Sequence, residues 1–286
     1  MPTIKHILFP FDFSTQGLLA VPFVRAIASR FGAKITLFSV LPPNWIAPPV
    51  GMGAFVAADE PELKDELQTR LDRELLNEFD QLTVSRVASY GDPAFKITEF
   101  AHENAVDLIM MPTHGSGSFR NLLLGSVTAK ILHDTHCPVW TATHAEEQGS
   151  PDVPRTVLCA IDGTPETVPV LKWASEFSQR MGAALKVLHV VLPISDWLAL
   201  PTERELQEQA RKEARLKIES LLKSAGVDAP LRVAVGKIAP TVDEEARQED
   251  ANLVIIGRGS SQSTLGRLRT HAYGIIQQSP CPVLSV

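Results

Sequence analysis

The feature that most constrains the fold of this chain is an internal repeat, because two similar halves of one sequence are expected to share one fold. Five pairs of segments match in the same order along the 286 residues: 7–12 with 157–162, 30–33 with 180–183, 35–40 with 185–190, 107–111 with 252–256, and 137–139 with 281–283. The stretch 144–154 is polar, contains Gly and Pro, and shows no periodicity, so it indicates a linker. We therefore predict two domains, 1–143 and 155–286.

Each half alternates short apolar runs with segments of helical period. In the first half the predicted strands are Lys5–Phe9, Lys34–Val40, Thr83–Ser89, Val106–Met111 and Val139–Thr141. Helices are predicted over 18–31, where Gly32 supplies the C-cap, over 62–82, where leucines recur every four residues, and over 203–225 in the second half. This alternation favours an α/β fold: two repeated, doubly wound domains, each a five-stranded, mostly parallel sheet with helices on both faces, similar to a Rossmann fold.

Charge and hydropathy exclude several kinds of partner. The net charge is -6 without a basic stripe, which argues against nucleic acid and against an anionic membrane surface. Neither a signal peptide nor an apolar run of about 20 residues is visible, so we expect a cytoplasmic protein. The three cysteines, Cys137, Cys159 and Cys281, lie in apolar strand contexts and are expected to be buried and reduced.

The stretch 112–126 is the strongest candidate for a binding site. It follows an apolar strand, is rich in Gly, Ser and Thr, and precedes a helix, which is the arrangement of a phosphate-binding loop. Neither a Gly-Lys-Ser/Thr ending nor a Gly-x-Gly-x-x-Gly pattern is present, so it is neither a Walker loop nor the dinucleotide fingerprint. Ser126 is expected to be the N-cap of the helix. A loop of this composition that binds nothing remains an alternative.

The spacing within the stretch identifies a known pattern. Nine residues separate Gly115 from Gly125, and Ser126 follows at once. This resembles the nucleotide loop of the universal stress protein (UspA) family, Gly-x-x-Gly, nine residues, then Gly-Ser/Thr, here in the tandem two-domain form. The first glycine of the pattern is replaced by Pro112, which has no N–H group and a fixed φ. The resemblance covers both halves and implies an adenine nucleotide alpha-hydrolase-like fold that binds ATP, with Mg²⁺ carried by the phosphates.

The resemblance also implies roles for individual residues. Asp12 and its neighbours would line the base and ribose, Val40 would offer backbone groups to the base, and Met111 would flank the ribose, while the glycine loop would hold the phosphates. The implied nucleotide site consists of Pro10, Phe11, Asp12, Val40, Met111, Pro112, His114, Gly115, Gly125, Ser126 and Val127.

Three of these roles have simpler alternatives. Asp12 could instead form an Asx-turn or cap the next helix, with Ser14 as the competing cap. His114 could contact phosphate or act as a general base, although an imidazole that only packs or faces solvent is favoured. His133 and His136 lack a visible third ligand, so no metal site is predicted and helix C-terminal histidines are the preferred interpretation.

The second half departs from the loop pattern. Counting back from 281–283 places Arg269-Thr270 where Gly125-Ser126 stand in the first half. A side chain at that position should crowd a bound triphosphate, which favours a structural second domain. An anion site made by Arg258, Arg267 and Arg269 is the alternative.

Two further features concern partners. The apolar, Pro- and Gly-rich segments 44–56 and 197–200 follow matching strands and could be lids, docking patches for unknown proteins, or loops packed on their own domain. The last strands, 138–141 and 282–286, are predicted sheet edges that pair within the chain, giving an intramolecular pseudo-dimer. A homodimer of the tandem chain is left open by the sequence.

Three functions follow in order of preference. The first is an ATP-binding regulator or sensor of stress response whose first domain holds the nucleotide and which is not a metabolic enzyme. The second is a nucleotide-independent interaction module of the same fold. The third is a slow ATPase, against which stands the lack of any evident pair of base and nucleophile.

Overall fold

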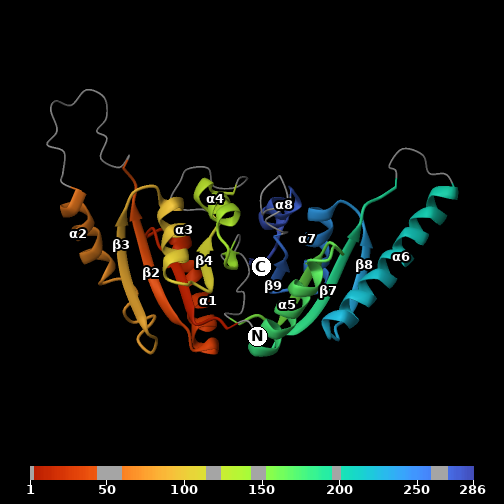
Figure 1. Ribbon diagram of the computed structural model, residues 1–286, viewed down its shortest axis with the longest axis horizontal. Helices are drawn as coiled ribbons and strands as arrows, with labels where there is room; N and C mark the ends of the chain where they lie inside the picture. The colour runs from red at the N-terminus through yellow and green to blue at the C-terminus, as the bar shows by residue number, and fades with distance from the viewer. Residues whose placement is uncertain (1–2, 44–59, 114–123, 143–152, 195–200, 259–269) are drawn as a thin grey trace, which may run out of the picture. The chain divides into compact units, whose positions relative to one another are not determined.

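The computed structural model describes residues 3–43, 60–113, 124–142, 153–194, 201–258 and 270–286 (Figure 1). Two compact units emerge. The N-terminal unit comprises Thr3–Arg120 and Gly125–Pro138, and the C-terminal unit comprises mainly Val139–Val286. Within the described ranges, no helix combines the length and the apolar character that a membrane span needs.

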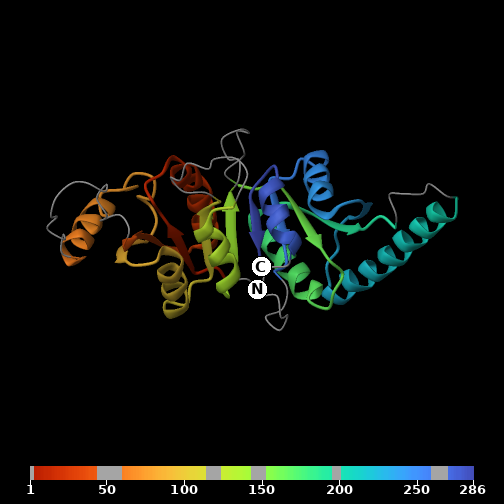
Figure 2. The ribbon, with the colours of Figure 1, turned by 90° about the horizontal axis from the view of Figure 1, so that it is seen from above.

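The N-terminal unit is a parallel sheet in the strand order β3-β2-β1-β4. Its elements are β1 (His6–Pro10), α1 (Thr15–Phe31), β2 (Lys34–Leu41), α2 (Glu60–Leu71), β3 (Val84–Tyr90), α3 (Pro93–Glu103), β4 (Leu108–Pro112) and α4 (Ser126–Asp134). Helices α3 and α4 pack together on one face, and α1 lies on the other (Figure 2). The central strand β1 is inaccessible on both faces, since Ile7, Leu8 and Phe9 are fully buried.

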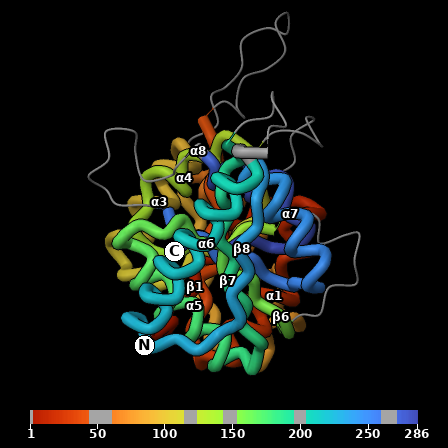
Figure 3. Tube along the Cα trace, turned by 90° about the vertical axis from the view of Figure 1, so that its right-hand side faces the viewer, coloured from red at the N-terminus to blue at the C-terminus, as the bar shows by residue number. Residues whose placement is uncertain are grey.

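The C-terminal unit repeats this pattern with two strands added, β10 and β5, in the order β5-β10-β9-β6-β7-β8. Its elements are β5 (Val139–Ala142), β6 (Thr156–Ile161), α5 (Thr167–Met181), β7 (Ala184–Val191), α6 (Pro201–Ala225), β8 (Leu231–Val235), α7 (Ile238–Gln248), β9 (Leu253–Ile256), α8 (Thr270–Gln278) and β10 (Val283–Ser285). Figure 3 faces the edge strand β8 and shows α6 and α7 on its two sides. The doubly wound α/β architecture predicted for both repeats is confirmed.

The strands that end the two repeats pair with each other inside the C-terminal unit. Strand β5 is antiparallel to β10, with Trp140 opposite Leu284. All other pairings described in the two units are parallel. The sequence predicted β5 and β10 to be sheet edges. Because they pair with each other, neither leaves the backbone hydrogen-bonding groups of its paired side exposed.

An equivalent side chain in each repeat fixes the start of the sheet. Asp107 Oδ2 accepts hydrogen bonds from the backbone N–H groups of Lys5 (2.7 Å) and His6 (2.9 Å). Asn252 Oδ1 does the same for Arg155 (3.0 Å) and Thr156 (3.1 Å). In both repeats, therefore, the residue just before the fourth strand (β4 or β9) links that strand to the start of the first strand (β1 or β6).

The helix predicted over 62–82 is shorter than expected. Helix α2 ends at Leu71, and residues 72–81 form a series of turns in which Leu75 has a φ of 55°. Leu71, Leu75 and Phe79 of the periodic stripe are buried as predicted, whereas Leu63 and Leu67 are half-buried, and helical geometry is lost after Leu71. The turns are held from outside the helix, because Arg86 of β3 donates through Nε (3.2 Å) and Nη2 (2.8 Å) to the carbonyl of Glu74.

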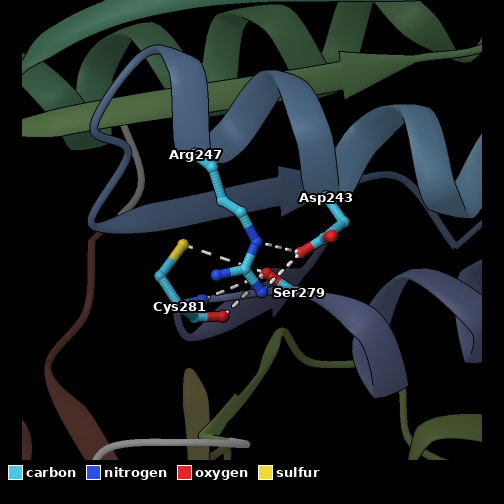
Figure 4. A network of polar contacts seen from close by, with 4 residues as sticks. All are labelled: Asp243, Arg247, Ser279 and Cys281. Carbon is cyan, nitrogen blue, oxygen red and sulfur yellow. Dashed lines mark hydrogen bonds and ion pairs between the residues drawn. The ribbon is translucent and has the colours of Figure 1, made fainter. Parts of the chain in front are cut away.

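Two of the three cysteines are buried, and none forms a disulfide. Burial raises the pKa of the Cys159 thiol to about 12. Burial likewise raises the pKa of Cys281 to about 12, against the opposing hydrogen bond from Ser279. Figure 4 shows Ser279 and Cys281 beside Asp243 and Arg247 of α7, and the Ser279 hydroxyl donates to the Cys281 carbonyl at 2.8 Å. Cys137 is only half-buried, which departs from the sequence prediction.

Candidate functional site

The two ends of the predicted phosphate loop meet. The backbone N–H of Gly125 donates to the carbonyl of Thr113 at 3.0 Å. One turn into α4, the Thr128 hydroxyl lies 3.4 Å from the carbonyl oxygen of Pro112 and 3.3 Å from that of Thr113. The end of β4 and the start of α4 are thereby held together.

The helix end at this point lacks a side-chain cap. Gly125 is the N-cap, with φ −57° and ψ 141°, and its carbonyl accepts from the N–H of Ala129 at 2.8 Å. No side-chain cap hydrogen bond is found there. The N–H groups of Ser126 and Val127, in the first turn, have no intrahelical acceptor, which is the arrangement that favours a bound anion. The prediction that Ser126 is the N-cap is wrong by one residue, because the helix begins at Ser126 itself.

Asp12 follows β1 and takes part in a local turn. Its Oδ1 accepts from the backbone N–H of Ser14 at 3.1 Å, and Ser14 Oγ accepts from the N–H of Gly17 at 3.1 Å as N-cap of α1. The two structural roles considered for this carboxylate and for Ser14 therefore occur together: Asp12 makes the Asx-turn and Ser14 the cap. The Asp12 side chain remains exposed.

The other described site residues lie at the same edge of the sheet. Pro10 ends β1, Val40 is next to last in β2, and Met111 and Pro112 end β4. Because β1 pairs with both β2 and β4 in parallel, these carboxyl ends are neighbours, and the N–H of Phe11 bonds to the Phe38 carbonyl at 2.9 Å. His114 and Gly115 lie outside the described residues.

Sequence reasoning missed an aromatic cluster at this edge. Phe13 has a φ of 59°, which is rare for a residue with a side chain, and its ring centroid is 5.2 Å from that of Phe11. The guanidinium carbon of Arg70 lies 3.7 Å from the centroid of Phe13, a cation–π contact. The internal repeat could have indicated the positive φ of Phe13, because a glycine, Gly163, occupies the equivalent position and has a φ of 73°.

The C-terminal unit contains a cavity of about 530 Å³ at the carboxyl ends of β6, β7 and β9, which the sequence did not predict. Helices α5, α7 and α8 contribute to its lining, as does Arg258, whose residue is only 5% exposed. Asp162 matches Asp12 and is engaged in its own turn: its Oδ1 accepts from the N–H (3.0 Å) and hydroxyl (2.7 Å) of Thr164 and from the hydroxyl of Thr167 (3.2 Å).

Metal ligands do not converge in the described part of the chain: no group of three His, Cys, Asp or Glu side chains there could hold an ion. His133 sits in the last turn of α4, where its Nδ1 lies 2.7 Å from Asp134 Oδ1. This contact is local to the helix end.

The chain resembles known proteins in sequence along its whole length. The model of the universal stress protein family matches residues 3–142 and again 154–286. A universal stress protein from Mycolicibacterium smegmatis is 26% identical over 287 residues, which cover 98% of this chain and 96% of the relative. Shared sequence therefore extends through both repeats.

Solved structures agree in fold. A universal stress protein from Archaeoglobus fulgidus superposes with a TM-score of 0.68 at 19% identity, covering 99% of this chain and 96% of that one. A universal stress protein in complex with cAMP covers 47% of this chain and 97% of its own, at 20% identity and a TM-score of 0.35, too low to support an argument. The family model, matched twice, shows that the chain belongs to the universal stress protein family, in its tandem form.

Proposed function

We propose that this chain is an ATP-binding regulator or sensor of stress response whose first domain, residues 1–143, holds the nucleotide. The observation that carries the proposal is the Gly125–Thr113 hydrogen bond, which brings both ends of the glycine loop to an open helix N-terminus. Family membership supports the same site, since the loop spacing is that of the family's nucleotide loop. The second domain, residues 155–286, has no glycine matching Gly125 and is assigned no nucleotide.

The residues present fit an adenine nucleotide. The uncapped N–H groups of Ser126 and Val127 would hold phosphate oxygens. Pro10, Phe11, Asp12, Val40 and Met111 lie along the edge formed by β1, β2 and β4, where the base and ribose would rest. Mg²⁺, if bound with the nucleotide, would be held mainly by the phosphates. Pro112 contributes only its carbonyl, so the loop has one N–H donor fewer than the family pattern.

The proposed role is regulatory rather than enzymatic. Among the described site residues, Asp12 supplies the carboxylate at this edge of the sheet. Because its Oδ1 accepts a hydrogen bond from the Ser14 N–H, Asp12 is a poor general base. We accordingly expect bound ATP to persist, and we expect the protein to act in the cytoplasm through a difference between its nucleotide-bound and nucleotide-free states. Phosphate release above the buffer rate, abolished by Gly125→Arg, would instead favour a slow ATPase.

The test is isothermal titration of ATP with Mg²⁺ into ligand-stripped protein and into Gly125→Arg. Gly125 has φ −57°, which any residue adopts, so the substitution places a guanidinium at the loop without straining the backbone. Gly125→Ala is the matched control, because it adds only a Cβ. We expect one site per chain in the wild type, weakened but present in Gly125→Ala and lost in Gly125→Arg.

Two results would count against the proposal. Binding that Gly125→Arg leaves unchanged would move the nucleotide away from this loop. An absence of binding at millimolar ATP, AMP and cAMP would leave a nucleotide-independent interaction module, and attention would pass to the apolar segment 44–56.

A further inference from the structure

We propose that the C-terminal unit binds a second ligand of a different class: a compact, uncharged, largely apolar molecule with an aromatic ring and no phosphate. The site is the cavity at the carboxyl ends of β6, β7 and β9. Its volume, about 530 Å³, falls in the range of roughly 300–1,000 Å³ typical of small-molecule sites. The proposal concerns a different part of the chain from the nucleotide loop and does not depend on it.

The lining explains the preference for an apolar body. The lining is mostly aliphatic and aromatic and comes from both helix layers and the sheet; it includes Val170, Trp173, Leu188, Ile238, Val242 and Ile275. Trp173 stacks on Phe177, with ring centroids 5.1 Å apart and planes 13° apart, so its indole is held in place. A fixed aromatic wall favours a planar ring, which it can contact by stacking at little cost in side-chain entropy.

One polar group is positioned to orient the ligand. His189 lines the cavity, and its Nδ1 lies 2.9 Å from the carbonyl oxygen of Ile161. Since a carbonyl can only accept, Nδ1 donates to it, and an imidazole with a single proton then offers Nε2 as an acceptor. A ligand with one hydroxyl or N–H donor therefore matches this site. The carboxylate of Asp162 is already engaged by Thr164 and Thr167.

The same region is unsuited to a phosphate chain. Gly257 matches Pro112, at the position where the family loop begins with glycine. A Cβ built on Gly257 would lie 2.9 Å from Val170 Cγ2, so α5 already covers that side of the strand end. The lining contains two carboxylates, Asp162 and Glu166, against one guanidinium, that of Arg258, so its charge does not favour a polyanion. The strand end at Gly257 is thus covered by Val170, and the cavity beside it is lined mostly by apolar side chains.

The experiment uses the full chain and N-phenyl-1-naphthylamine, an uncharged aromatic amine with one N–H whose fluorescence rises in apolar surroundings. Its sulfonate analogue, 8-anilinonaphthalene-1-sulfonate, tests the effect of charge. Val170→Phe fills the cavity from α5, and Ala160→Leu, half-buried on β6, fills it independently. Leu216→Ser, at an α6 side chain 68% exposed and outside the cavity, is the matched control for binding to surface apolar groups.

We expect saturable binding of the amine at one site per chain, weakened at least tenfold in Val170→Phe or Ala160→Leu and unchanged in Leu216→Ser. The sulfonate should bind more weakly than the amine, and saturating ATP should displace neither. Thermal unfolding shows whether Val170→Phe or Ala160→Leu has lost its fold. In that case the binding measurement on the other variant tests the proposal. Equal binding in a folded filled variant, no saturable binding, tighter binding of the sulfonate, or displacement by ATP would each overturn the proposal.

Discussion

The N–H of Gly125 donates to the carbonyl of Thr113 at 3.0 Å, so the chain leaves β4 and enters α4 at a single point. This contact joins main-chain atoms, so it does not depend on the side chain of Thr113. The second contact, from the Thr128 hydroxyl to the carbonyls of Pro112 and Thr113, reinforces it from inside the helix. The open helix end is thereby presented at the carboxyl edge of the sheet, where ligands of parallel α/β folds bind.

Asp107→Ala should destabilise the N-terminal unit by about 1–3 kcal/mol, since it leaves two backbone N–H groups without their acceptor. Asp107→Asn should cost much less, because Asn252 performs the same task through Oδ1 in the other repeat. Urea unfolding of the three proteins measures the difference. If Asp107→Asn were as damaging as Asp107→Ala, charge rather than acceptor geometry would hold the strands together.

Acidification should destabilise the protein through His6. Burial lowers the pKa of this imidazole, the nearby Lys34 lowers it further, and the Asn104 carbonyl and Asp107 oppose both. The folded state thus binds the proton more weakly than the unfolded state, whose value is near 6.5. Stability is therefore complete above this value and falls as the pH drops below it, by at most about 1.4 kcal/mol per pH unit for one group.

The measurement is the urea midpoint of wild type and His6→Gln between about pH 7.5 and 5. In the wild type, His6 Nε2 lies 2.8 Å from Thr36 Oγ1, and Nδ1 lies 3.1 Å from the Asn104 carbonyl. Glutamine can hydrogen-bond but does not titrate, so its pH dependence should be shallower. Parallel curves for the two proteins would exclude His6 as the source.

Gln68→Ala should loosen the edge of the N-terminal sheet. The Gln68 amide accepts from the N–H of Ala88 at 2.7 Å and donates to the carbonyl of Arg86 at 3.0 Å, as a neighbouring strand would. Hydrogen exchange at the Ala88 amide should accelerate in the variant, while the amide of Leu8, in the central strand β1, should keep its protection. Unchanged exchange at Ala88 would show that the contact does not protect the edge.

Native thiols should differ in reactivity. The pKa of Cys159 and of Cys281 is raised to about 12 by burial, so both remain protonated at pH 8, whereas Cys137 is half-buried. An aromatic disulfide reagent should therefore modify one thiol first, and Cys137→Ser should remove that phase. Fast modification of all three thiols in the absence of denaturant would contradict this ordering.

Much of the fold was predictable because the signals are local and occur twice. Strands β2 and β3 fall within one residue of their predicted ranges, and Gly32 and Gly182 both end helices with positive φ. The error at 72–81 arose because side-chain periodicity reports burial rather than backbone geometry. Leu75 is buried with a φ of 55°, held there by Arg86 contacts that a single segment cannot reveal.

The site was predictable only in part, for a similar reason. Composition and spacing placed the loop ends, and the position after the first strand, with the family resemblance, placed Asp12. The structure brings the described members to one edge. The cavity in the C-terminal unit depends on contacts between elements far apart in sequence, such as Val170 with Gly257. No local pattern encodes such packing. The cation–π contact of Arg70 with Phe13 was missed for the same reason.

The most direct test of the central claim is to locate the nucleotide by photolabelling the full chain with 8-azido-ATP and mapping the modified peptides by mass spectrometry. The account predicts label on peptides from residues 1–143, competed by ATP and absent in Gly125→Arg. Peptides that carry Trp173 and His189, which line the second cavity, should remain unmodified. Competed label on those peptides, with none in the first half, would contradict the account.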